Sequence, residues 1–211
     1  MTATTPTPTS TDDIRVLVVD DHPAVRAGLE GLLVGERGLD CIATLAETVG
    51  LLRVVSETRP DVVVLDYALG AEDGLTTCFR LKQQSMAPAV VMYSAYADRV
   101  LTVPAAIAQV DAMVSKSGPV SDLLAAIRGV ASGGPRLPRI DAELIEAASA
   151  RLPADDFPIA SMLLAATRIP DIANVLAMPE TEVRRRALRI IGRLQAESRL
   201  RARTRSTCLE R

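Results

Sequence analysis

The chain has 211 residues, 48% of them hydrophobic, which is enough for two small domains with buried cores. It has no Trp, two Phe and three Tyr, so the core must be aliphatic, as in a parallel sheet covered by helices. The net charge is only −2, but from Arg184 onward there are ten arginines against two glutamates. A basic end of this kind favours a polyanionic partner for that part of the chain.

Composition also excludes several classes of protein. The cysteines, at positions 41, 78 and 208, form no CxxC pair and no cluster with histidine, which argues against a zinc site. No apolar run approaches the roughly 20 residues that span a bilayer, so we expect no membrane contact and a cytoplasmic protein. Residues 1–12 are rich in Thr and Pro and read as a disordered leader rather than a signal peptide.

The first 134 residues alternate between aliphatic runs and stretches with helical periodicity. The runs predict strands at residues 14–19, 39–45, 61–65, 89–93 and 112–114. Helices are expected at residues 24–34, 49–55, 74–84, 95–109 (kinked or broken at Pro104) and 120–131. This alternation predicts an α/β fold over residues 13–134, with a doubly wound, five-stranded parallel sheet.

The remainder is expected to be helical. Residues 135–150 read as a linker with a short helix, and residues 151–198 as a small all-α domain. Within it, a short helix at 171–176, a tight turn and a longer helix from Glu180 to about Arg199 form a helix-turn-helix pattern. Residues 199–211 form a basic tail that either extends phosphate contact or is disordered.

Polar residues follow the predicted strands where each one ends, at Asp20-Asp21, Asp66, Ser94 and Lys116. Because the carboxyl ends of parallel strands share one edge, these side chains should converge there. Crowded carboxylates without His or Cys ligands suit Mg²⁺, and a metal, a lysine and a hydroxyl together suit a phosphoryl group. Asp66 can then be the nucleophile that forms an aspartyl phosphate.

The string VLVVDDHPAVRAGLEGLL, the five polar positions and Asp73-Gly74 resemble the receiver domain of NarL/LuxR-type response regulators, a flavodoxin-like fold. The resemblance implies that Asp66 accepts phosphate from a histidine kinase and that Ser94 and Lys116 contact it. Asp20, Asp21, Asp66 and the backbone of Ala68 would hold Mg²⁺. Ser94 and Met113 would form the switch, although Met113 replaces the usual aromatic residue and Gly70 replaces a usual proline.

Residues 152–194, and IPDIANVLAMPETEV above all, resemble the LuxR-type helix-turn-helix. The resemblance implies that the helix from Glu180 enters the major groove of double-stranded DNA and that the active protein is a homodimer. The candidate DNA contacts are Glu180, Thr181, Arg184, Arg185, Arg186, Arg189 and Arg193. Glu182 and Arg186 depart from the family's pattern.

The leading hypothesis is therefore a transcription regulator controlled by phosphorylation, and not an enzyme. One alternative is an adaptor whose helical module binds protein or RNA. Another is a haloacid dehalogenase-type phosphatase, although Asp20-Asp21-His22 does not have the required Asp-x-Asp spacing. His22, the single histidine, is either a phosphorelay residue or simply the start of the first helix, and we favour the second interpretation.

Overall fold

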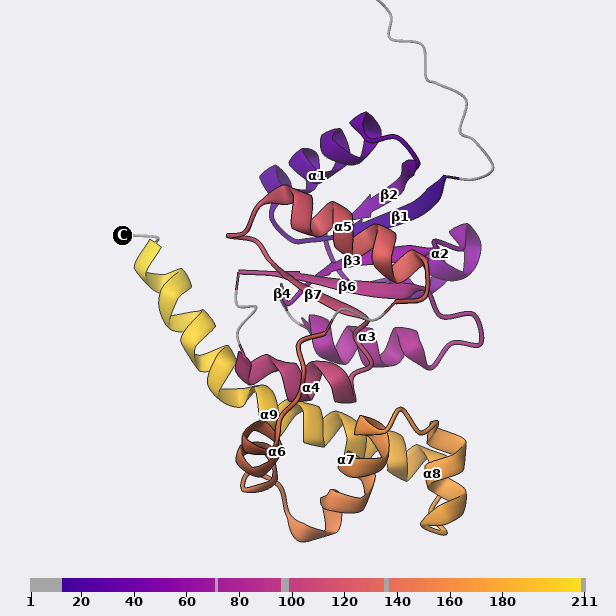
Figure 1. Ribbon diagram of the computed structural model, residues 1–211, viewed down its shortest axis with the longest axis vertical. Helices are drawn as coiled ribbons and strands as arrows, with labels where there is room; N and C mark the ends of the chain where they lie inside the picture. Colours follow the sequence, from indigo (N-terminus) through magenta and orange to yellow (C-terminus); the bar gives the residue numbers. More distant parts are fainter. Residues whose placement is uncertain (1–12, 71, 96–98, 135–136, 210–211) are drawn as a thin grey trace, which may run out of the picture.

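The computed structural model describes residues 13–70, 72–95, 99–134 and 137–209, with side chains described as far as residue 196. The expected leader at residues 1–12 lies outside this range. A five-stranded sheet in the order β2-β1-β3-β6-β7 lies at the centre of the first domain, and every neighbouring pair is parallel (Figure 1). Its strands are β1 (Ile14–Val19), β2 (Leu39–Leu45), β3 (Val62–Asp66), β6 (Ala89–Ser94) and β7 (Ala112–Ser115). The predicted doubly wound α/β fold is confirmed.

Helices cover both faces of the sheet, so the central strands are buried on both sides. One face packs against α1 (Pro23–Gly35) and α5 (Val120–Ala131) through side chains such as Leu33 and Ile127. The other face packs against α2 (Leu51–Thr58), α3 (Gly74–Lys82) and α4 (Thr102–Ile107). The aliphatic composition thus fills two hydrophobic layers, one on each side of the sheet.

Two details of the first domain differ from the sequence prediction. The fourth helix begins with a 3₁₀ turn, η1 (Arg99–Leu101), and α4 then runs through Pro104 without a break. Pro104 lies in the first turn of α4, where the backbone N–H has no helical partner, so the expected kink or break is wrong. A short antiparallel hairpin, β4 (Ala68–Leu69) and β5 (Glu72–Asp73), also follows Asp66.

The second half of the chain is helical, as expected. It contains α6 (Ala142–Ser149), the 3₁₀ turn η2 (Ala154–Asp156), α7 (Phe157–Leu164), α8 (Ile169–Val175) and α9 (Glu180–Leu209). The helix α9 continues ten residues beyond the predicted end, so a disordered tail is the wrong description of residues 199–209. Although α9 is long, none of the described helices is both long and apolar enough to cross a membrane.

The helical module lies directly on the first domain rather than apart from it. Helix α9 contacts α7 and α8 of its own module and also α3, η1 and α4 of the first domain (Figure 1). One cluster of buried residues therefore includes Phe79 and Val103 of the first domain together with Ile159, Ile191 and Leu194 of the module. The expected boundary at residues 135–150 stays a prediction, since this hydrophobic core extends across it.

Candidate functional site

Buried carboxylates and a lysine meet at the carboxyl edge of the sheet, as the sequence predicts. Asp20 follows β1, Asp66 ends β3, and their side chains are 1% and 3% exposed. The ammonium Nζ of Lys116, which follows β7, donates to Asp20 Oδ2 at 2.6 Å and lies 2.9 Å from Asp66 Oδ2. One lysine therefore stands between two buried carboxylates that come from separate strands.

The charges in this cluster shift one another's proton affinity. Burial raises the pKa of the Asp66 carboxyl above its ordinary value, and the neighbouring Lys116 ammonium offsets only part of that rise. Burial acts to lower the pKa of Lys116, but the carboxylates of Asp66 and Asp20 outweigh it and raise the pKa. Lys116 is therefore held in its charged form, while Asp66 pays a desolvation cost for its own charge.

The hydroxyl residue and the switch residue lie on the neighbouring strands. Ser94, at the end of β6, is completely buried, and its carbonyl accepts a hydrogen bond from the Lys116 backbone N–H at 2.9 Å. Met113 on β7 is partly buried and packs against the hydrophobic cluster that reaches α4 and α9. Ser94 thus lies at the same sheet edge as the carboxylates, and Met113 lies in the apolar layer that contains α4. Their role as a switch stays a prediction.

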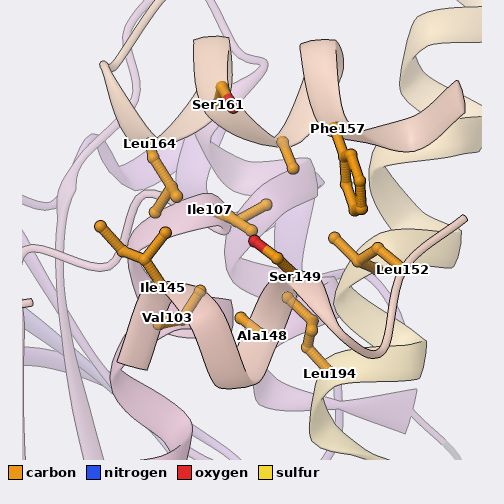
Figure 2. A pocket seen from close by; sticks show the side chains of 11 residues that line it. Val103, Ile107, Ile145, Ala148, Ser149, Leu152, Phe157, Ser161, Leu164 and Leu194 are labelled. Carbon is orange, nitrogen blue, oxygen red and sulfur yellow. The ribbon is translucent and has the colours of Figure 1, made fainter. Parts of the chain in front are cut away.

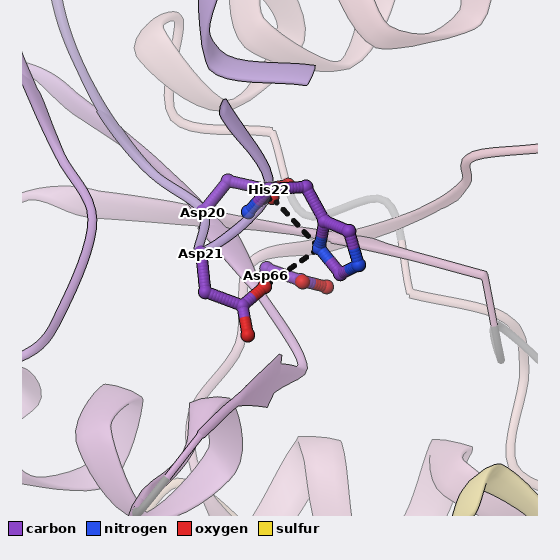
Figure 3. Close-up of side chains that lie close together, drawn as sticks. All are labelled: Asp20, Asp21, His22 and Asp66. Atoms are coloured by element: carbon purple, nitrogen blue, oxygen red, sulfur yellow. Dashed lines mark hydrogen bonds and ion pairs between the residues drawn. The ribbon is translucent and has the colours of Figure 1, made fainter. Parts of the chain in front are cut away.

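Asp21 and His22 form the exposed rim of the site. His22 precedes α1, and its backbone N–H donates to Asp20 Oδ1 at 2.9 Å, which fits the interpretation that it starts the helix. Its ring also makes a contact with the carboxylates that the sequence did not suggest. The imidazole Nδ1 lies 2.6 Å from Asp21 Oδ1 and 3.4 Å from Asp20 Oδ1, facing the carboxylates (Figure 3). The signal that could have revealed this contact is its position directly after two aspartates.

The residues at this edge fit a divalent cation. One ligand atom from each of Asp20, Asp21, His22 and Asp66 can be chosen so that all four lie within 4.8 Å of one another. Three carboxylates against one lysine leave a net negative charge, and carboxylate oxygens are the ligands that Mg²⁺ prefers. The Ala68 backbone N–H donates to the Asp66 carboxylate. The expected use of the Ala68 carbonyl as a metal ligand stays a prediction.

Gly74 fixes the backbone behind Asp66. A Cβ atom at this position would lie 2.3 Å from the Asp66 carbonyl oxygen and 2.9 Å from Tyr67 Cα. The Gly74 N–H donates to the Tyr67 carbonyl at 2.8 Å, and Asp73 caps α3 by accepting from the Thr76 N–H. The Asp73-Gly74 pair therefore lets the start of α3 approach the end of β3 closely enough to hold Asp66 in place.

A family comparison agrees with this geometry. Residues 16–128, just over half of the chain, match the model of the response regulator receiver domain. The chain belongs to the response regulator receiver family. Among curated relatives, the transcriptional regulatory protein LiaR of Bacillus subtilis is 26% identical over 124 residues, which are 59% of each chain. The DNA-binding transcriptional activator EvgA of Escherichia coli is 24% identical over 120 residues, 57% of this chain and 58% of the relative.

The matched part of the chain thus spans less than two thirds of the length of these curated relatives. Enzymes are also among the similar proteins: a protein-glutamate methylesterase/protein-glutamine glutaminase of Geobacter metallireducens is 34% identical over 79 residues, only 23% of that enzyme's length. A solved LuxR-family response regulator from Aurantimonas has a TM-score of 0.56 at 25% identity, covering 64% of this chain and 94% of that one. An RcsB–DNA complex covers 86% of the regulator and 92% of its own chain with a TM-score of 0.57, but at 17% identity this likeness shows the fold alone.

Several candidate DNA contacts on α9 of the regulator are paired within the helix. Arg184 forms an ion pair with Glu180 at 2.5 Å, one turn away. Arg185 forms a two-pronged pair with Glu182, with nitrogen–oxygen distances of 2.8 and 2.7 Å. These pairs neutralise much of the charge at the start of α9, next to the exposed Thr181.

Arg186 faces a different direction from the other candidates. Its guanidinium lies 2.6 Å from Asp156 Oδ1, also bonds the Asp155 carbonyl, and is 15% exposed, while Asp156 is 4% exposed. The side chain links α9 to the turn before α7, and its expected contact with DNA stays a prediction. Arg189 and Arg193 are exposed at one-turn spacing and form no ion pair with any side chain that the structure describes.

Proposed function

We propose that this response regulator is phosphorylated on Asp66 by a sensor histidine kinase and controls transcription through DNA binding by its helical module. The observation that carries the proposal is the placement of Asp66 beside Lys116 and Asp20 at the carboxyl edge of the sheet. In the transfer step an Asp66 carboxylate oxygen attacks the phosphorus of a phosphohistidine. The P–N bond breaks as the new P–O bond forms, and the imidazole of the kinase is the leaving group.

Each neighbouring residue has a defined role in this step. Lys116 neutralises charge on the incoming phosphoryl oxygens and on Asp66, and its raised pKa keeps it protonated. The Ser94 hydroxyl contacts a phosphoryl oxygen. Asp20, Asp21, Asp66 and the Ala68 carbonyl would hold Mg²⁺, which when bound supplies positive charge to the phosphoryl oxygens.

The same site is connected to the output by a short segment of chain. Ser94 ends β6, and Thr102, only eight residues later, begins the α4 helix against which α9 packs. Between them, Arg99 of η1 forms ion pairs with Asp141 and Glu143 at the start of α6. A shift of Ser94 toward a phosphoryl group would therefore move η1 and α4 and loosen their contacts with α6 and α9. Met113, which replaces the family's usual aromatic residue, is a flexible side chain that can move with Ser94.

DNA binding is supported by the exposed part of α9. Arg189 and Arg193 are exposed and pair with no described side chain, so they can contact phosphates. Arg184 and Arg185 could exchange their glutamate partners for phosphate oxygens. The relatives LiaR and EvgA are a transcriptional regulator and a DNA-binding activator, respectively. We expect the active form to be a homodimer, since a two-fold pair of such helices would bind two half-sites.

A second candidate function is an adaptor whose helical module binds protein or RNA. The observation in its favour is that Arg184, Arg185 and Arg186 all have acidic partners within the chain, which weakens the attraction for duplex phosphates. The adaptor would use the same phosphorylation site but would not bind duplex DNA.

Fluorescence anisotropy of the full-length protein on mixed-sequence duplex DNA separates the two candidates. We expect binding that weakens steeply with salt and tightens with Mg²⁺ and beryllofluoride, because arginine–phosphate contacts release counterions. Asp66→Ala should abolish the response to beryllofluoride. An Asp66→Ala variant that responds like wild type would refute the proposed phosphorylation mechanism. Failure of the wild type to bind duplex in either state would favour the adaptor.

A further inference from the structure

The rim of the phosphorylation site contains a nitrogen donor, the imidazole of His22. His22 is the only histidine in the chain, and its side chain is 65% exposed. Its Nδ1 faces the carboxylates, 2.6 Å from Asp21 Oδ1 and 3.4 Å from Asp20 Oδ1 (Figure 3). The ring therefore lies beside the position where a cation would bind.

The short Nδ1–Asp21 distance defines the state of the ring when no cation is bound. A carboxylate can only accept hydrogen bonds, so Nδ1 must carry the proton and donate it to Asp21. The imidazole N–H thus donates a hydrogen bond to the Asp21 carboxylate, just as the Lys116 ammonium lies against the Asp66 carboxylate. A cation that binds Asp21 through Oδ1 competes with this hydrogen bond, and the ring is then released to take another role.

We propose that His22 becomes a ligand, so that the site prefers borderline divalent transition ions such as Co²⁺ over Mg²⁺. The proton on Nδ1 passes through solvent to Nε2, and the freed Nδ1 lone pair binds the ion alongside oxygens of Asp20, Asp21 and Asp66. Imidazole nitrogen adds affinity for Co²⁺ or Ni²⁺ but little for Mg²⁺, which prefers oxygen. The inference rests on the proposed function only in that these carboxylates hold a divalent cation.

Neither of the described cysteines competes with His22 at this site. Burial raises the pKa of the Cys41 thiol to about 11, and burial also raises the pKa of Cys78, which is completely enclosed. Both thiols are therefore protonated at neutral pH, and neither belongs to the cluster of possible ligands at the sheet edge. Any imidazole signal from a bound metal must come from His22.

The first test compares affinities of the full-length protein for Co²⁺ and Mg²⁺ by calorimetry, in wild type and in His22→Gln. The substituted side chain is largely exposed and the backbone N–H that bonds Asp20 is retained, so the fold should be preserved. We expect Co²⁺ affinity to fall by about tenfold or more, a loss typical of disrupted metal sites. Mg²⁺ affinity should stay the same or rise slightly, because Asp21 loses its internal partner. An equal fall for both ions would overturn the inference.

The second test detects the bond itself. In the Co²⁺ form, NMR should show contact-shifted carbon-bound protons from a single imidazole, since contact shifts require a Co–N bond. These signals should disappear in His22→Gln and in Asp21→Asn. Bound Co²⁺ without such signals would overturn the inference, as would signals that persist in Asp21→Asn and Asp66→Asn, because the ring would then bind metal apart from the carboxylates.

The measurement of Mg²⁺ affinity separates this inference from the proposed function. If wild type binds Mg²⁺ but shows no His22-dependent preference for Co²⁺, only the role of His22 is wrong. If wild type binds Co²⁺ through His22 but does not bind Mg²⁺, the inference stands and the magnesium assignment in the proposed function is wrong. Neither measurement requires kinase or DNA.

Discussion

Thr102 at the start of α4 and Gln195 on α9 are both completely buried, on two helices that pack against each other across the junction of receiver and helical module. Neither the Thr102 hydroxyl nor the Gln195 amide has a hydrogen-bond partner among the described residues. A buried polar group without a partner destabilises the structure that buries it. The contact between receiver and α9 is therefore weaker than its apolar area suggests.

Replacing Gln195 with methionine should strengthen this contact, because the unpartnered amide is removed at nearly constant length. We expect the free energy of unfolding to rise by about 1–3 kcal/mol in urea denaturation. The gain in DNA affinity on adding beryllofluoride should shrink, since the docked form is favoured. Gln195→Glu, which buries a charge, should do the opposite. A destabilised Gln195→Met would show that the amide has a partner in solution.

A pocket beside this contact also indicates that the packing between the receiver and the helical module is imperfect. A pocket of about 50 Å³ lies between α4, α6, α7 and α9, with walls that include Ile107, Ile145, Phe157 and Leu194 (Figure 2). The pocket is partly open to solvent, so the apolar side chains along its walls lack packing partners on that side. Imperfect packing and unpartnered polar groups thus coincide at the junction that the proposed mechanism requires to open.

Gly74→Ala tests whether the close approach of α3 holds Asp66 in place. The added methyl would overlap the Asp66 carbonyl, so we expect a loss of about 1–3 kcal/mol in stability and slower phosphorylation by a small acyl phosphate. Gly31→Ala is the matched control, because nothing lies within 4 Å of a Cβ there and the position is helical. It should stabilise α1 by about 0.5–1 kcal/mol. Equal effects of the two variants would argue against a special role for Gly74.

The buried charge of Asp66 predicts a dependence of stability on pH. Its folded pKa is raised by burial, so the folded state holds this proton more tightly than the unfolded state does. The stability it contributes is present below the ordinary carboxyl pKa and is lost as the pH rises through the raised value. Asp66→Asn should therefore be more stable than wild type at neutral pH, in metal-free buffer, and the difference should vanish on acidification. Thermal unfolding at several pH values measures it, and a difference that grows toward low pH would contradict the sign.

Arg186 and Arg189 should separate stability from DNA binding. Arg186→Ala leaves the buried Asp156 carboxylate unpaired, so we expect a loss of about 3–5 kcal/mol in the free energy of unfolding. Arg189→Ala removes only an exposed charge and should leave stability nearly unchanged. It should, however, lower the salt dependence of DNA binding by about one unit of slope. If Arg189→Ala did not change the slope, this face of α9 would not be the DNA surface.

The receiver and its site were largely predictable because the aliphatic runs in the sequence show where each strand ends and which polar residue follows it. Once the run before Asp66 is recognised as a central strand, its carboxylate must lie at the same edge as Asp20 and Lys116. The packing of α9 was not predictable in this way. The spacing of Val183, Ala187 and Ile190 shows that one face is buried, but not whether α7, α8 or the receiver covers it. For the same reason Arg186 could not be told apart from its exposed neighbours.

The hydrophobic core that extends from α3 and α4 into α9 also bears on how such regulators evolve. Phe79 and Val103 of the receiver share one apolar cluster with Ile191 and Leu194 of the helical module. A receiver grafted onto a foreign output would leave one half of this surface exposed to water. Substitutions tolerated on either of the helices α4 and α9 should therefore depend on the residues that the other helix presents.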